Sequence, residues 1–291
     1  MVAYIGLLGM KIIVKTNRAI VFSKKILRTQ LMGLRLSSIK GRYTAPKVLT
    51  NSIPKAGTNL MERVLMLMPG MRMAASRTVL DWGECSSKTE RKLINIKKGQ
   101  FLNAHLPSHK KVIDIVDRKN IKSILMIRDP RDVVISNYKY VNEIDITHPT
   151  HKIISTLNDD NERLLAVIRG IDGAIASVDE LWRRFDYWFN DSNTLIVKYE
   201  DLVGPLGGGN LKTQVYTVKN IAEHIGVNIS SDEIEYIAKN IYSSKASTFR
   251  KGTVGGWKKT FNKEHIQVFK KQSKDLLIKL GYESNNDWEG S

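Results

Sequence analysis

A loop near residue 55 combines residue types that could bind an anion. Residues 51–65 read NSIPKAGTNLMERVL and follow the apolar pair Val48–Leu49. A strand, a tight loop and a helix start form an anion-binding layout, because the first N–H groups of a helix point toward the ligand. The ATP-binding pattern Gly-x-x-x-x-Gly-Lys-Ser/Thr places its lysine after a second glycine. Here Lys55 precedes Gly57, so we expect a phosphate-type anion site outside that pattern.

Polar residues follow the other apolar stretches as well. His105, Arg128 and Tyr199 each stand at the end of one of these stretches and are candidate ligand-binding residues. A later loop contributes Arg250, Lys251 and Gly252. The cations fall into two groups, Lys55 in one and Arg128, Arg250 and Lys251 in the other. Two separate cationic groups suit a ligand with two anionic ends.

A metal is not expected at this site. A magnesium-nucleotide site needs an aspartate after an apolar strand to hold the ion. Asp129 has that place, but it precedes Pro130 and is better explained as the cap of a helix. No Cys/His cluster has the spacing of zinc ligands.

Strands and helices that alternate along the chain must position these residues. We expect strands at 47–53, 101–107, 123–130 and 194–202, and helices at 58–68, 131–141, 178–189, 214–225, 231–242 and 263–280. This order predicts an α/β fold, a three-layer sandwich with a central parallel sheet and helices on both faces. Ligands then bind at the carboxyl ends of the strands. Trp182, Phe185 and Trp188 have helical spacing and are expected in the core.

Composition sets the broad class of protein. The 291 residues are 42% hydrophobic, so a large core is expected, and the formal net charge is +17. That charge suggests polyanionic partners, although a solvated basic surface would also explain it. The single cysteine, Cys85, excludes an internal disulfide and suits a reducing compartment.

The N-terminal segment 1–42 contains no acidic residue, and we separate it from a single domain at 43–291. Within it, residues 19–36 predict a basic amphipathic helix. The helix could lie on an anionic membrane, pack on the domain or belong to a transit peptide. No apolar run approaches the roughly 20 residues of a membrane span. We therefore expect a cytoplasmic protein with possible peripheral contact at the inner face of a membrane.

Four segments in order, SIPKAGTN, IRDPRDVVISNY, VKYEDLV and FRKGTVGGWKKTF, carry a family resemblance. Together with NAHLP they resemble the sulfotransferase family of the cytosolic type, which uses 3'-phosphoadenosine 5'-phosphosulfate (PAPS). The resemblance extends from about residue 45 to 270. It implies PAPS as sulfuryl donor, a P-loop-like phosphosulfate-binding loop and no requirement for a metal.

The resemblance also implies roles for single residues. Lys55 matches the lysine that donates to the oxygen between phosphate and sulfur, and His105 matches the general base that deprotonates the acceptor. Ala56, Gly57, Thr58 and Asn59 match the phosphate cradle. The implied contacts to the 3'-phosphate and the adenine come from Arg128, Ser136, Tyr199, Arg250, Lys251 and Gly252. Two positions depart from the family pattern: Leu60 replaces a tryptophan that stacks on adenine, and Gly256 replaces an aspartate.

Two other classes stay open at this stage, a P-loop-type nucleotide kinase or phosphotransferase and a non-enzymatic polyanion-binding protein. No specific nucleic-acid partner is expected.

The acceptor is less defined by the sequence than the donor. Residues 142–175, where the family has a lid over the acceptor, contain no aromatic residue. We therefore expect a glycan, a glycolipid or another alcohol, or an amine, in preference to a phenol.

Overall fold

The computed structural model describes residues 44–75, 77–241 and 253–290. The helix predicted within 1–42 and the residues Arg250, Lys251 and Gly252 lie outside this part. The described chain forms a six-stranded sheet in the order β2-β4-β1-β5-β6, with β3 paired to β4. The strands are β1 (Lys47–Ser52), β2 (Arg72–Met73), β3 (Val79–Leu80), β4 (Gln100–His105), β5 (Ile121–Ile127) and β6 (Thr194–Lys198).

All the strand pairs of this sheet are parallel, as predicted. Strand β1 lies between β4 and β5, and its buried side chains alternate between the two faces. Val48 belongs to the hydrophobic cluster on one face and Leu49 to the cluster on the other. A strand that is buried on both faces tends to read as an apolar run, and β5 carries such a run at Ile124–Ile127. In β1 only Val48 and Leu49 are apolar, and its remaining buried positions are polar.

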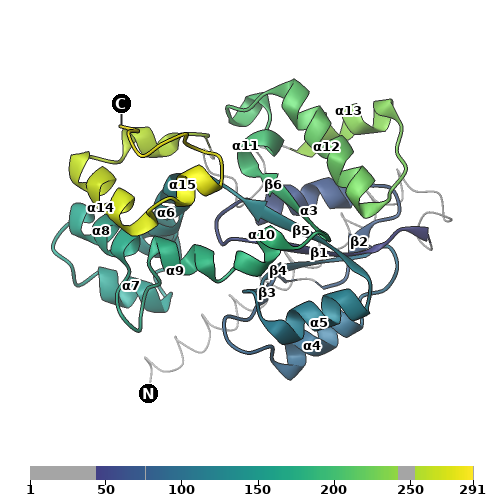
Figure 1. Cartoon of the computed structure of the whole chain (residues 1–291), viewed down its shortest axis with the longest axis horizontal. Helices are drawn as coiled ribbons and strands as arrows, with labels where there is room; N and C mark the ends of the chain where they lie inside the picture. The colour runs from purple at the N-terminus through teal and green to yellow at the C-terminus, as the bar shows by residue number, and fades with distance from the viewer. Residues whose placement is uncertain (1–43, 76, 242–252, 291) are drawn as a thin grey trace, which may run out of the picture.

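Helices cover both faces of the sheet, which confirms the predicted three-layer α/β sandwich (Figure 1). One face packs against α3 (Thr58–Leu67), α12 (Leu211–Ile225) and α13 (Ser231–Ile241). The other face packs against α4 (Ser87–Ile94), α5 (Lys110–Arg118), α9 (Val178–Arg183) and α10 (Asp186–Asn190). Beyond the carboxyl ends of the strands lie α6 (Pro130–Lys139), α7 (Pro149–Ile154), α8 (Asp160–Arg169), α14 (Lys263–Ser273) and α15 (Leu276–Lys279).

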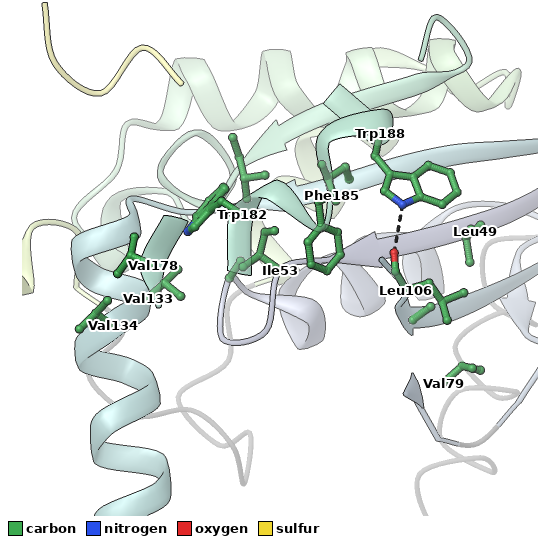
Figure 2. Packing of buried hydrophobic residues seen from close by; sticks show 14 of the residues in the cluster. Leu49, Ile53, Val79, Leu106, Val133, Val134, Val178, Trp182, Phe185 and Trp188 are labelled. Atoms are coloured by element: carbon green, nitrogen blue, oxygen red, sulfur yellow. Dashed lines mark hydrogen bonds between the residues drawn. The ribbon is translucent and has the colours of Figure 1, made fainter. Parts of the chain in front are cut away.

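The aromatic residues at helical spacing form part of the core, as predicted. Trp182, Phe185 and Trp188 are each at most 2% exposed. The indole Nε1 of Trp188 donates to the carbonyl oxygen of Leu106 at 3.0 Å, as Figure 2 shows. The same carbonyl accepts from the amide of Asn51, whose side-chain oxygen accepts from the N–H of Leu106. The chain just after β4 is therefore held in one position.

Several predicted elements are wrong in extent. The strand expected at 194–202 ends at Lys198, and Tyr199 begins the short helix α11 (Tyr199–Leu202). The helix expected at 178–189 divides into α9 and α10. The helix expected at 263–280 divides into α14 and α15, because Lys274 between them has a positive φ of 49°. The short strands β2 and β3 and the helices α4 and α5 were not predicted. Within the described residues, no helix has the length and apolar character needed to cross a bilayer.

Candidate active site

The loop after β1 has the conformation of a ligand-binding turn. Lys55 and Gly57 have φ values of 68° and 111°. A Cβ atom at Gly57 would lie 2.7 Å from Cδ2 of Tyr199 and 2.9 Å from Cε of Met126, so only glycine fits there. Gly57 also occupies the cap position of α3, and no side chain caps that helix end. The first N–H groups of α3, beginning with Thr58, therefore face the loop.

His105 lies at the end of β4, next to this loop. Its Nδ1 lies 2.7 Å from the carbonyl oxygen of Ser52. A carbonyl oxygen only accepts, so Nδ1 carries the proton and Nε2 keeps its lone pair. The hydroxyl of Ser52 lies 3.1 Å from the same Nδ1 and 2.7 Å from the hydroxyl of Thr58. A chain of polar contacts therefore links His105 to the start of α3.

The surroundings of His105 favour its neutral form. Burial lowers the pKa of His105 below its ordinary value of 6.5, and the positive charge of Lys55 lowers it further. The hydrogen bond to Ser52 acts in the opposite direction, but it is the smaller effect relative to burial. A neutral imidazole with a fixed tautomer is the form that can accept a proton.

Lys55 itself lies against an aromatic ring. Its Nζ is 3.8 Å from the ring centroid of Tyr140, a cation–π distance. Tyr140 begins a π-helical turn, Tyr140–Ile144, directly after α6. Such turns are rare and occur often at functional sites. Tyr140 was not predicted from the sequence, because its ring meets Lys55 only through the packing of α6 beside the loop.

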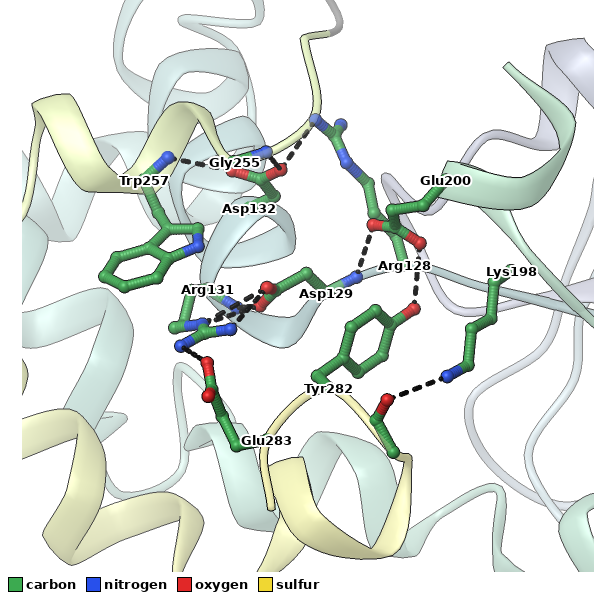
Figure 3. Close-up of polar contacts among 11 residues, drawn as sticks. Arg128, Asp129, Arg131, Asp132, Lys198, Glu200, Gly255, Trp257, Tyr282 and Glu283 are labelled. Carbon is green, nitrogen blue, oxygen red and sulfur yellow. Dashed lines mark hydrogen bonds and ion pairs between the residues drawn. The ribbon is translucent and has the colours of Figure 1, made fainter. Parts of the chain in front are cut away.

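Arg128 follows β5 and is buried at 8% exposure (Figure 3). Its guanidinium lies 4.5 Å from the ring centroid of Tyr199, and one terminal nitrogen donates to the carbonyl of Thr253 at 3.2 Å. The same nitrogen lies 3.3 Å from a carboxylate oxygen of Asp132. The Nε of Arg128 is buried and has no hydrogen-bond partner among the residues that the structure describes. A buried donor without a partner is costly, and a bound anion would satisfy it.

Helix α6 begins beside Arg128, as the sequence predicted. Asp129 caps it by accepting from the N–H of Arg131, and Pro130 occupies the first turn. Asp132 and Ser136 are four residues apart on α6 and therefore share one face of the helix. Ser136 is half-buried. Helix geometry thus turns Ser136 toward the side on which Asp132 meets Arg128.

A partly buried polar network holds the residues that follow Arg128 in the chain (Figure 3). The carboxylate of Glu200 accepts from the N–H of Asp129 and from the hydroxyl of Tyr282, both at 2.9 Å. Burial raises the pKa of Glu200. The Arg131 guanidinium pairs with Asp129 and Glu283 and lies against the indoles of Trp257 and Trp288. This network was not predicted, because all of its contacts except that of Arg131 with Asp129 join residues more than 70 positions apart.

The structure places most of the predicted site residues at one edge of the sheet. The Lys55 loop, His105, Arg128 and Tyr199 meet at the carboxyl ends of β1, β4, β5 and β6. Tyr199 lies with its ring between Gly57 and Arg128. The described residues contain no group of three or more His, Cys, Asp or Glu side chains that could hold a metal ion.

The fold and this edge define a class of protein, an α/β protein with an anion-binding loop at the carboxyl ends of its strands. Residues 45–281 match the family model described as the sulfotransferase domain, so the chain belongs to the sulfotransferase family and is a PAPS-dependent sulfotransferase. This membership decides among the three classes that the sequence alone left open.

Relatives of known function support the assignment. The chain is 25% identical to Sulfotransferase 2A6 of Mus musculus over 262 residues, covering 77% of this chain and 82% of that protein. It is 26% identical to Sulfotransferase 2A1 of Rattus norvegicus over 248 residues, covering 75% and 80%. It is 25% identical to the amine sulfotransferase of Oryctolagus cuniculus over 270 residues, covering 82% and 85%.

Two solved structures share the fold. One is mouse sulfotransferase SULT7A1 complexed with PAP, with a TM-score of 0.60 and 21% identity over 81% of this chain and 88% of that one. The other is retinol dehydratase in complex with androsterone and inactive cofactor PAP, with a TM-score of 0.51 and 16% identity over 79% and 80%. These likenesses confirm the predicted α/β architecture.

Proposed function

We propose that this chain moves a sulfuryl group from PAPS to a hydroxyl or amine acceptor, with His105 as general base and Lys55 as the donor to the leaving oxygen. The observation that carries the proposal is the contact between His105 Nδ1 and the carbonyl of Ser52. It leaves Nε2 able to take a proton, beside a loop that presents Lys55 and the first N–H groups of α3.

The chemistry assigned to these residues is an in-line displacement. The acceptor oxygen or nitrogen forms a bond to sulfur, its proton passes to Nε2 of His105, and the bond between sulfur and the bridging oxygen breaks. The electron pair stays on that oxygen, which becomes part of the phosphate of adenosine 3',5'-bisphosphate. Because negative charge grows there, the ammonium of Lys55 stabilises the transition state more than the ground state.

The remaining predicted residues would hold the nucleotide. Residues 56–59 offer backbone N–H groups to the 5'-phosphosulfate. Arg128, whose buried Nε lacks a partner among the described residues, and Ser136 on α6 would bind the 3'-phosphate. Tyr199 stays a predicted contact on the adenine side. The predicted clamp residues Arg250, Lys251 and Gly252 lie outside the described residues and stay part of the proposal.

Exposed apolar side chains near His105 favour an acceptor with an apolar body. Leu80 is 63% exposed and is the β-sheet partner of His105, and Trp82 is 41% exposed. The Trp82 ring meets Phe185 edge-on at 6.3 Å. Of the acceptors expected from the sequence, these residues favour an alcohol with an apolar ring system or a lipid-like body over a plain saccharide.

The experiment compares His105→Ala, Lys55→Met and Arg128→Ala in initial-rate assays and in calorimetric binding of adenosine 3',5'-bisphosphate. His105→Ala and Lys55→Met should each reduce turnover by about 10²-fold or more, with far smaller effects on binding. Arg128→Ala should weaken binding by about one to two decades, because a charge-assisted contact contributes about 1.5–3 kcal/mol.

The matched control is His224→Ala. His224 is also partly buried, and it contacts a strand carbonyl, that of Ser123, at 2.8 Å. It lies on α12, near the amino end of β5 and away from the carboxyl ends that form the site. Its removal should leave turnover near the parent value. Near-parent turnover in His105→Ala would contradict the base assignment. The same assay with an alcohol that has an apolar ring system and with a saccharide tests the acceptor. A preference for the saccharide would refute an apolar acceptor.

A further inference from the structure

Asp132 joins two segments of the chain that are more than 120 residues apart. One carboxylate oxygen accepts from the N–H of Trp257 at 2.9 Å. The other accepts from the N–H of Gly255 at 3.0 Å and lies 3.3 Å from the terminal nitrogen of Arg128. The Asp132 side chain is 2% exposed. Arg128 contacts the same segment by donating to Thr253.

These contacts form a closed ring that includes one terminal nitrogen of the Arg128 guanidinium. Asp132 holds Gly255 and Trp257 by their backbone N–H groups, and Arg128 holds the carbonyl of Thr253. The ring fixes the direction in which the guanidinium points. It also fixes the described segment 253–257 next to it.

The role of Asp132 differs from that of an ordinary acidic residue in a first helical turn. Such a residue supports its own helix through the helix dipole, but the cap of α6 is already supplied by Asp129. The partners of the Asp132 carboxylate described above, Arg128, Gly255 and Trp257, all lie outside α6. The carboxylate is therefore directed away from its own helix.

We infer that Asp132 is a positioning residue for recognition of the nucleotide 3'-phosphate: it orients the Arg128 guanidinium and fixes residues 253–257 beside it. This inference rests on the proposed function of Arg128. It also predicts the direction in which nucleotide binding changes when the carboxylate is removed. A carboxylate that acted only through its charge would repel a phosphate at Arg128, so removing it would tighten binding. A positioning carboxylate has the opposite effect, because its removal misaligns the donors.

The test measures dissociation constants for adenosine 3',5'-bisphosphate and adenosine 5'-monophosphate by calorimetry. The variants are Asp132→Ala and Asp132→Asn, since an asparagine can keep one backbone contact but not the pair with Arg128. The preference for the bisphosphate should fall by about tenfold or more in Asp132→Ala and by less in Asp132→Asn. Binding of the monophosphate, which lacks the 3'-phosphate, should change by no more than about twofold, because Asp132 acts only on the 3'-phosphate contacts.

Asp191→Asn is the matched control. Asp191 accepts from the N–H of Asn193 and the hydroxyl of Thr194 at the start of β6, the end of that strand opposite the site. Its removal should leave the preference for the bisphosphate unchanged. In rate assays Asp132→Asn should raise KM for PAPS and leave kcat near the parent value, because His105 and Lys55 are untouched.

The outcomes separate the inference from the proposed function. A parent protein that binds both nucleotides equally would refute the 3'-phosphate site itself. A parent that prefers the bisphosphate, with the same or a stronger preference in Asp132→Asn, would refute the role of Asp132 alone. Equal loss of affinity for both nucleotides would also refute it and would show a general packing role. If Asp132→Ala does not fold, Asp132→Asn decides the question.

Discussion

At the scale of single residues, the pKa of His105 depends on burial, on the hydrogen bond to Ser52 and on one neighbouring charge. Burial and the charge of Lys55 lower the pKa, and the net shift is to below 6.5. The base must be neutral, so turnover should fall as the pH falls through this lowered pKa, and the acid limb of the rate profile should lie below pH 6.5. The Lys55→Met variant removes the charge and keeps most of the burial, so the pKa of His105 should rise.

Histidine NMR titration of the parent and of Lys55→Met measures this shift directly, without requiring activity. His224 serves as the internal reference. Burial lowers its pKa as well, with Lys122 among the further causes, but Lys55 is not among them. An unchanged or lowered His105 pKa in the variant would show that Lys55 does not act on it.

Residues at the ends of apolar strands could be predicted from the sequence. Lys55 and Arg128 follow β1 and β5, and His105 is the last residue of β4. Each of these strands contains an apolar stretch that the sequence shows, and parallel strands end at one edge. The site roles of Ser52 and Tyr140, and the contact between Thr58 and Ser52, could not be predicted in this way. Their roles depend on hydroxyl and ring contacts that form only when β1, β4 and α6 are packed together.

At the scale of elements, the segment after α15 stabilises the helix that follows Arg128. Trp288 is 8% exposed, and its ring meets Trp257 at 5.4 Å and the Arg131 guanidinium at 4.6 Å. The segment therefore packs on α6 through Arg131 and on residues 253–257 through Trp257. The family match ends at residue 281, so Trp288 lies outside the residues that the family model covers.

Trp288→Ala should lower the free energy of unfolding by about 3–5 kcal/mol, the usual cost of truncating a buried tryptophan. Urea denaturation monitored by circular dichroism gives the value. Trp82→Ala is the control, since Trp82 is 41% exposed and its loss should cost much less. Similar losses in the two variants would mean that Trp288 does not pack as described.

Element boundaries were less predictable than element types. Tyr199 continues the apolar pattern of β6 but begins α11, where its ring covers Gly57. Lys274 continues the periodicity of α14, yet its positive φ ends that helix. Neither residue signals a boundary in the sequence, since neither is a glycine or a proline. The short strands β2 and β3 were missed because two residues are too few for a periodic pattern.

At the scale of the whole molecule, the division between residues 1–42 and the domain stays a prediction that deletion can test. The described domain has its own core on both faces of the sheet. A protein lacking residues 1–42 should therefore fold and bind adenosine 3',5'-bisphosphate with the parent dissociation constant. At a ligand concentration of about 100 times that constant, both proteins should gain about 2.7 kcal/mol of stability.

Flotation with anionic and neutral vesicles tests the expected membrane contact through residues 1–42. The parent should bind anionic vesicles through its acid-free basic segment, and the shortened protein should not. Equal vesicle binding by the two proteins would refute membrane contact through residues 1–42. Loss of nucleotide binding on deletion would instead refute the domain boundary.

The packing of residues 282–288 on Arg131 and Glu200 has a consequence for the order of events during synthesis. The strands that supply Lys55, His105 and Arg128 are all translated before residue 200. Arg131 and Glu200 obtain their partners Glu283, Trp288 and Tyr282 only after those residues leave the ribosome. A nascent chain stalled after α14 should therefore have its sheet but remain sensitive to protease around α6.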